Sequence, residues 1–445
     1  MSLSRPFTGF EKAFINTKEL VQLAVELDPK DIVPSLNKLQ KKVIGLRLKR
    51  DSDNLILSKE SYPIQRIPDY VKNVREAVEW AETQHFDFKE TMSIVSANDR
   101  FIVINSSHSV TDGGALSTYL KSLYEDEKVD SNEIISFPKT FNDFFSKEIE
   151  ERRLNPNFKN VNEDLNQTVT FYKWNQEPVQ NFDPSTKASY FTFIENVEKF
   201  QCYNKKTQKC EKLTENNMGS IMLATNAINI LNKKNNIIND GNIMNNIRKD
   251  GIDTSDCVFG CSVCVDMRQF LPRNVNMFEV GNFFTLVVLG AQNFSLDMTL
   301  NEFYEAIRKN FSKQKQNDGL MDAIYSMDNG KACDSINLEK TPISTVILSN
   351  VGLLQVKPPV KDVWMSLKMS AMKTDPELVL LSYGRKGNGK NDVVNLLRYS
   401  SRVIPHEDAK IMGESMKFML TNIPPTESVG TALNEVYKFQ KQFKQ

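Results

Sequence analysis

A histidine and an aspartate four residues apart give this 445-residue sequence its clearest chemical signal. They are His108 and Asp112, in the run HSVTDGG that ends with Gly113 and Gly114. An imidazole titrates near neutral pH, so it can accept the proton of a hydroxyl or an amine as that group attacks an acyl carbon. His108 is therefore the candidate general base. The alternative is a histidine whose hydrogen bonds are satisfied locally at the end of a strand.

The residues around His108 predict the elements that must position it. Phe101 to Ile104 is an apolar run typical of a buried strand, and residues 105–107 are polar. After the turn residues at 112–114, apolar side chains recur at helical spacing from Leu116 to Tyr124. The segment therefore indicates a strand, a glycine turn and an amphipathic helix, with His108 where the strand ends and a cleft can open.

Two other motifs resemble functional sites, a phosphate-binding loop and a nucleophile elbow, but their residues favour a structural role. GRKGNGKN at residues 384–391 nearly fits a phosphate-binding loop, but Asn391 replaces the hydroxyl that binds the metal ion there. Asn388 and Gly389 between two apolar runs predict a β-hairpin instead. The sequence GCSVC at residues 260–264 is one glycine short of a nucleophile elbow.

The remaining histidines and the clustered cysteines are weaker candidates. His85 and His406 lie in stretches that favour surface or packing roles. Cys257, Cys261 and Cys264 stand among apolar residues without a second pair of metal ligands nearby, which favours buried thiols over a zinc site. We therefore expect no metal ion.

Composition narrows the class of protein. Lys plus Arg equals Asp plus Glu at 56 each, which argues against nucleic acid as a partner. The longest apolar run, near residues 283–289, is too short to span a membrane, and the first ten residues lack the apolar core of a secretory signal. Scattered cysteines suit a reducing compartment. We expect an intracellular, cytoplasmic monomer, with peripheral contact on the endoplasmic reticulum or lipid droplets left open.

The length predicts two domains. The proline-containing stretch at residues 174–187 separates residues 1–180 from residues 181–445. An Asn-rich segment at residues 232–251 is interpreted as a surface insertion. Residues 428–445 predict a helix that either packs on the fold or, as a basic amphipathic helix, contacts a membrane surface.

The motif at residues 108–113 resembles the HxxxDG signature of acyl-CoA-dependent acyltransferases with the chloramphenicol-acetyltransferase-like fold. The chain is most similar to the fungal alcohol acetyltransferase family within that group. Further similar stretches follow in the family's order: RPFTGFE at residues 5–11, VDMRQFLP at 265–272, GN at 281–282, SNVG at 349–352 and DVVNLLRYSSRV at 392–403.

The resemblance implies an α/β fold of two domains, with mixed sheets, flanking helices and an active-site channel between the domains. It also implies acetyl-CoA as cosubstrate, direct transfer in a ternary complex, and a structural ion pair of Asp112 with Arg268 that supports the site. From the residues alone, Asp112 could instead orient His108 as in a triad, or cap the following helix.

Candidates for stabilising the oxyanion come from two places. The backbone amides of Gly113 and Gly114 stand at a predicted helix N-terminus, where the helix dipole favours negative charge. Ser349 and Asn350 could reach the site from the second domain, or could simply form a turn after a strand. The residues that bind the CoA moiety are not identifiable.

Three functions follow from these expectations. The first is acetyl transfer from acetyl-CoA to the hydroxyl of an alcohol or a sterol, with His108 as base. The second is N-acetylation of a hydrophobic or sphingoid-like amine, as in detoxification. The third is a catalytically silent protein of the same fold that binds a lipid or a partner.

Overall fold

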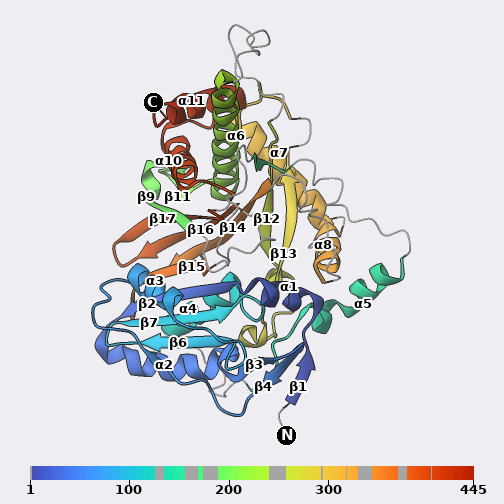
Figure 1. Cartoon of the computed structure of the whole chain (residues 1–445), viewed down its shortest axis with the longest axis vertical. Coiled ribbons are helices and arrows are strands. Elements are labelled where there is room, and N and C mark those ends of the chain that lie inside the picture. Colours follow the sequence, from blue (N-terminus) through green and yellow to red (C-terminus); the bar gives the residue numbers. More distant parts are fainter. Residues whose placement is uncertain are drawn as a thin grey trace.

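The computed structural model describes ten stretches of the chain: residues 3–125, 135–155, 169–173, 189–239, 257–291, 294–316, 318–328, 343–368, 378–401 and 403–444. Within them, the chain forms two main β-sheets with helices packed around them (Figure 1). The predicted boundary at residues 174–187 and residues 240–251 of the Asn-rich segment lie outside these stretches. No helix in the described ranges combines the length and the apolar character needed to cross a bilayer.

The first sheet has five strands in the order β15-β2-β7-β6-β5. Its strands are β2 (Leu20–Leu27), β5 (Gln65–Arg66), β6 (Ser93–Ala97), β7 (Phe101–Ser107) and β15 (Val360–Lys368). The helices of this half are α1 (Gly9–Thr17), α2 (Pro29–Lys42), α3 (Val74–Thr83) and α4 (Gly113–Tyr124). A small antiparallel sheet lies beside it, formed by β1 (Leu3–Pro6), β3 (Leu48–Asp51) and β4 (Asn54–Leu57). The strand β7 and the helix α4 confirm the strand and helix predicted around His108.

The second sheet has seven strands, in the order β13-β12-β14-β16-β17-β9, with β8 paired to β14. They are β8 (Phe171–Lys173), β9 (Ser189–Asn196), β12 (Gly260–Asp266), β13 (Phe284–Gly290), β14 (Ile343–Gln355), β16 (Leu378–Gly387) and β17 (Lys390–Tyr399). The helices of this half are α5 (Phe141–Leu154), α6 (Leu213–Asn239), α7 (Leu300–Gln316), α8 (Gly319–Asp328), α10 (His406–Asn422) and α11 (Val429–Lys441). The short pair β10 (Tyr203–Asn204) and β11 (Lys209–Cys210) precedes α6.

Two local predictions in this half are confirmed. Strands β16 and β17 pair as an antiparallel hairpin closed by Asn388 and Gly389, whose φ angles of +46° and +75° are those of a tight hairpin turn. The terminal helix α11 packs on α6 and buries Val429, Leu433 and Val436. The glycine-rich stretch is therefore a turn, and α11 presents its apolar side to the protein.

The strand β15 crosses between the two halves. It lies more than 170 residues beyond residue 180 in the sequence. It nevertheless pairs antiparallel with β2 and forms one edge of the first sheet. Trp364 and Met365 of β15 are buried in the core of the first half. The two structural units therefore do not follow a single division of the chain at residue 180, and both parts of the sequence border the space between the sheets.

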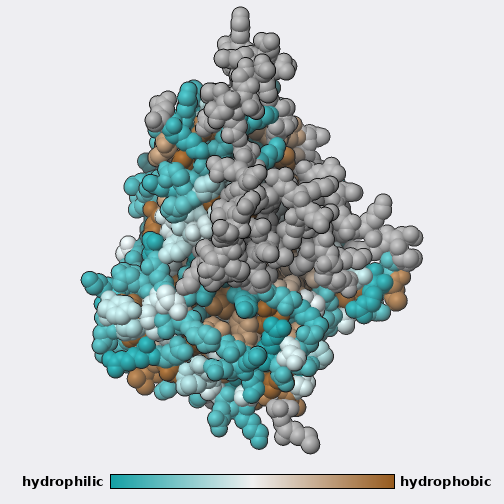
Figure 2. Space-filling view, viewed as in Figure 1, coloured by the Kyte–Doolittle hydropathy of each residue, from teal (hydrophilic) through white to brown (hydrophobic). Residues whose placement is uncertain are grey.

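The surface has the distribution expected of a fold that buries its apolar side chains. On the face shown in Figure 2, hydrophilic residues cover most of the coloured surface. Two large apolar clusters, one around each main sheet, account for most of the buried hydrophobic residues. Burial of apolar area on this scale is the main favourable contribution to folding.

Candidate active site

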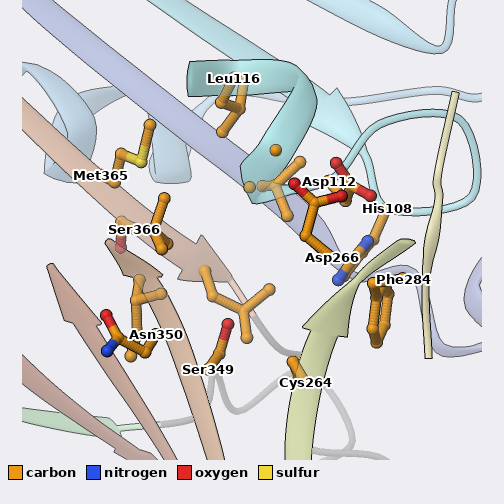
Figure 3. A pocket seen from close by; sticks show the side chains of 16 residues that line it. His108, Asp112, Leu116, Cys264, Asp266, Phe284, Ser349, Asn350, Met365 and Ser366 are labelled. Carbon is orange, nitrogen blue, oxygen red and sulfur yellow. The ribbon is translucent and has the colours of Figure 1, made fainter. Parts of the chain in front are cut away.

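A cavity of about 100 Å³ lies between the two main sheets, beside the N-terminus of α4 (Figure 3). The parallel strands β12 and β14 pair only at Ser262 with Ile347 and at Val263 with Leu348, and residues beyond this pairing in both strands line the cavity. The polar lining residues are His108, Asp112, Asp266, Ser349, Asn350 and Ser366. The remaining lining residues are Val21, Gly113, Gly114, Leu116, Cys264, Phe284, Val351, Met365, Leu367 and Leu381.

The His108 imidazole is fixed in one orientation at the edge of this cavity. Its backbone N–H donates to the Glu19 carbonyl at 2.8 Å, and its Nδ1 lies 3.0 Å from the Thr111 carbonyl oxygen. A carbonyl can only accept, so Nδ1 carries the proton and Nε2 keeps its lone pair. The rings of Phe14 and Phe284 pack against the imidazole, with distances between ring centroids of 4.5 and 5.3 Å. Figure 3 shows the ring pointing into the cavity.

The protonation of His108 follows from this environment. The residue is 8% exposed, and burial lowers the pKa of its imidazole below the ordinary value of 6.5. The nearby charge of Asp112 opposes the shift but does not cancel it. At neutral pH the ring is therefore uncharged and able to accept a proton at Nε2.

Asp112 both caps α4 and forms the ion pair with Arg268 that the resemblance implies. Its Oδ1 accepts from the Ala115 amide at 2.9 Å, and its Oδ2 accepts from the Phe283 amide at 2.7 Å. Arg268 approaches both oxygens, at 2.8 and 2.9 Å. Burial alone would raise the pKa of Asp112, but the charge of Arg268 and the hydrogen bonds from Arg268, Ala115 and Phe283 together outweigh burial and hold the pKa below its usual range. Since Thr111 is the Nδ1 partner of His108, the geometry differs from a triad.

The stretch after Arg268 fastens the His108 loop from the other half of the chain. Arg268 Nη2 also donates to the Gly281 carbonyl, and the Asn282 side-chain amide donates to the His108 carbonyl. A Cβ at Gly281 would lie 2.6 Å from the Pro138 side chain, which explains the glycine. In the sequence, Asn282 is part of the GN stretch that the resemblance includes. The structure gives Asn282 a structural role, because its side chain holds the backbone of the candidate base.

Gly113 and Gly114 form the first turn of α4 and line the cavity. A Cβ at Gly114 would lie 2.5 Å from Arg268 Nη1, whereas one at Gly113 would meet only the Val351 side chain at 3.3 Å. Amides in a first helical turn have no acceptor within the helix. The structure therefore keeps both as candidates for holding a negative oxygen, and it shows why position 114 needs a glycine.

Ser349 and Asn350 lie within β14 and line the cavity, which favours the first of the two alternatives, but they differ in what they contact. Asn350 donates to Thr214 Oγ1 at 2.7 Å and accepts from the Gly352 amide at 3.0 Å. These bonds hold a β-bulge, where Gly352 has a φ of +89°. The Ser349 side chain faces the cavity (Figure 3). Of the two, Ser349 is the one whose position suits contact with a substrate.

The motif at the start of the chain has a structural explanation. Arg5 and Glu11 form a two-pronged ion pair at 2.8 and 2.7 Å, and Arg5 also reaches the Pro138 carbonyl at 3.3 Å. Glu11 completes a capping box with Thr8 at the start of α1. The helix α1 carries Phe14 against His108. The motif therefore positions one wall of the site.

Sequence reasoning missed three residues that border His108. Phe14 and Phe284 carried no signal, because isolated aromatic residues are common in cores. Asp266 did carry one, since it stands in the VDMR stretch, but only the arginine of that stretch was interpreted. Over the described ranges, no group of three or more His, Cys, Asp or Glu side chains could hold a metal ion.

The fold has clear relatives among solved structures. Polyketide synthase associated protein 5 from Mycobacterium tuberculosis superimposes with a TM-score of 0.59 at 10% identity, covering 94% of this chain and 98% of that one. The EpoB NRPS cyclization-docking bidomain from Sorangium cellulosum gives 0.59 at 13%, covering 96% and 87%. The NRPS condensation enzyme VibH gives 0.52 at 10%, covering 98% and 97%.

These likenesses show the fold. The chain has the two-domain α/β architecture of the condensation and chloramphenicol-acetyltransferase-like group, as expected from its sequence. No protein-family model matches the chain, and a search of curated sequences finds no significant match. The nearer resemblance to the fungal alcohol acetyltransferases stays a prediction.

Proposed function

We propose that the protein transfers an acetyl group from acetyl-CoA to the hydroxyl of an apolar alcohol, with His108 as general base. The observation that carries the proposal is the state of one imidazole. Its Nδ1 is bonded to the Thr111 carbonyl, and burial keeps the ring neutral, so Nε2 is free to accept a proton in the cavity. A positioned base of this kind contributes about 10²- to 10⁴-fold in rate.

The reaction needs no nucleophile of the protein. The acceptor oxygen forms a bond to the thioester carbon as its proton moves to His108 Nε2. The tetrahedral intermediate then collapses, the carbon–sulfur bond breaks, and the imidazolium returns the proton to the leaving thiolate. The products are the acetyl ester and free CoA thiol. Ser349 Oγ and the amides of Gly113 and Gly114 are the candidates for donating hydrogen bonds to the oxyanion.

The acceptor class follows from the walls beyond His108. The apolar lining of the cavity includes Leu116, Met365, Leu367 and Leu381. Such side chains favour an alkyl or ring system over a sugar or a charged metabolite. A small or extended apolar alcohol with its hydroxyl toward His108 fits this lining.

The test is the release of free thiol from acetyl-CoA in the presence of a panel of alcohols, sterols and long-chain amines. We expect wild-type protein to release thiol with at least one alcohol, and the His108→Ala variant to do so at least 100-fold more slowly. His85→Ala is the matched control, because His85 is exposed and does not line the cavity. Equal release by wild type and His108→Ala with every acceptor would overturn the proposal.

A further inference from the structure

Asp266 ends β12 beside His108 and uses only one of its two carboxylate oxygens. Oδ1 accepts from Arg268 Nη1 at 3.1 Å and from the Arg268 backbone amide at 3.0 Å. Among the residues that the structure describes, none hydrogen-bonds Oδ2. The Asp266 side chain is 53% exposed, against 4% for Asp112, and it lines the cavity. Figure 3 shows it on the same side of the cavity as His108.

The charges around Asp266 do not balance. The single guanidinium of Arg268 is shared by two carboxylates, those of Asp112 and Asp266. The Asp112 carboxylate binds two nitrogens of Arg268 and accepts from two backbone amides, so both of its oxygens have hydrogen-bond partners. Burial and the Asp112 charge raise the pKa of Asp266 despite Arg268, because the one positive charge of Arg268 compensates the two carboxylates only in part. A net negative charge therefore remains on the cavity wall, in a place where a cation would gain from binding.

We infer that Asp266 Oδ2 binds a cationic nitrogen of the acceptor, so that the acceptor is an apolar amino alcohol rather than a neutral alcohol. The inference rests on the proposed acetyl transfer and names its substrate class. The ammonium group pairs with Asp266, the neighbouring hydroxyl faces His108 Nε2, and the alkyl part lies against the apolar wall formed by Met365 and Leu367. The transfer step is unchanged, since the ammonium keeps its protons while the hydroxyl proton passes to His108.

The test compares two acceptors that differ by one amino group, 2-aminooctan-1-ol and octan-1-ol. The quantity measured is the ratio of their kcat/KM values for thiol release from acetyl-CoA at pH 7. A hydrogen bond to a charged group supports a preference of about 10- to 100-fold for the amino alcohol. Asp266→Asn should reduce that ratio toward one. A purely structural role for Asp266 would lower both rates together and leave the ratio unchanged.

The matched control is Asp362→Asn. Asp362 is also a strand carboxylate paired with an arginine, at 3.0 Å from Arg385, but it does not line the cavity. That variant should keep the wild-type ratio. A wild-type ratio near one, or a ratio that Asp266→Asn leaves unchanged, would overturn the inference.

Calorimetric binding separates this inference from the proposed function. The dissociation constants of the same two compounds are measured on wild type and on Asp266→Asn, without acetyl-CoA. Preferential binding of the amino alcohol that Asp266→Asn abolishes supports the inference even where no thiol is released, and in that case only the proposed acetyl transfer fails. Equal binding of both compounds to wild type contradicts the inference even where thiol is released.

Discussion

Replacing Asp112 by asparagine should destabilise the folded protein and also slow the proposed acetyl transfer. The substitution keeps the shape of the side chain but removes its charge and one of its two acceptor oxygens. The Asp112 carboxylate accepts from Arg268 and from the amides of Ala115 and Phe283, while both members of the ion pair are less than 10% exposed. Asparagine cannot accept from all of these donors, so Arg268 keeps a buried charge with a weaker partner.

The expected loss follows from breaking a buried ion pair. Removing one partner typically costs about 3–5 kcal/mol. We expect the lower end, about 3 kcal/mol, because Asp266 and the Gly281 carbonyl still contact Arg268. The assay is urea unfolding followed by tryptophan fluorescence. Asp69→Asn is the control, since its ion pair with Arg66 at 3.3 Å joins side chains that are each 80% exposed, and its loss should cost under about 1 kcal/mol.

The dependence of the free energy of unfolding on pH gives the same experiment a second readout. The pKa of Asp112 lies below its ordinary value of 3.8 in the folded protein, because the charge of Arg268 and the hydrogen bonds that the carboxylate accepts together outweigh the opposing effect of burial. The stabilisation by its charge is thus fully present above about pH 4 and is lost as the pH falls toward the folded pKa. The difference in stability between wild type and Asp112→Asn should shrink below pH 4.

Two outcomes would refute this reasoning. One is an Asp112→Asn protein that unfolds within 1 kcal/mol of wild type but has lost its acetyl-transfer step, which would favour a role in orienting His108. The other comes from adding Arg268→Met. Because that change removes the stranded charge, the double variant should lose less stability than the sum of the two single variants. Simple additivity would show that the pair is not coupled.

Three further predictions concern the same loop. The pH profile of kcat/KM should reach half of its plateau only below pH 6.5, because burial lowers the pKa of His108 and the neutral ring is the active form. Asn282→Ala, which frees the His108 carbonyl, should lower kcat about 10-fold or more while KM for acetyl-CoA changes less, as steady-state kinetics would measure. Gly114→Ala should lower the melting temperature by several degrees, because its Cβ would lie 2.5 Å from Arg268 Nη1, whereas Gly113→Ala should shift it far less.

The local part of the site could be predicted from sequence because its signals are local. Phe101 to Tyr124 encodes a strand, a turn and a helix through apolar period and turn residues within one short window. The hairpin at Asn388 and Gly389 is equally short-range, since two positive φ angles select those residues. Such features need no knowledge of what packs against them.

The contacts between distant segments could not be predicted in the same way. Asn282 and His108 are 174 residues apart, and neither residue type indicates the other as its partner. The strand β15 has the same buried, apolar pattern as strands of the second sheet, so nothing local shows that it pairs with β2. The ion pair of Asp112 with Arg268 was expected only through the family resemblance. In each case the deciding interaction depends on tertiary packing.

Arg268 links the two tasks that the site has to perform. Two of its nitrogens hold Asp112, the cap of α4, and the Gly281 carbonyl accepts from Arg268, so that the loop that carries the base is fixed. The same guanidinium holds only one oxygen of Asp266, a residue that lines the cavity, and no hydrogen bond within the described residues reaches the other oxygen. A lysine at 268 could supply the charge but not the planar fork that serves three acceptors at once. The arginine is thus required by geometry as much as by charge: it makes one carboxylate purely structural while leaving its neighbour available to a substrate.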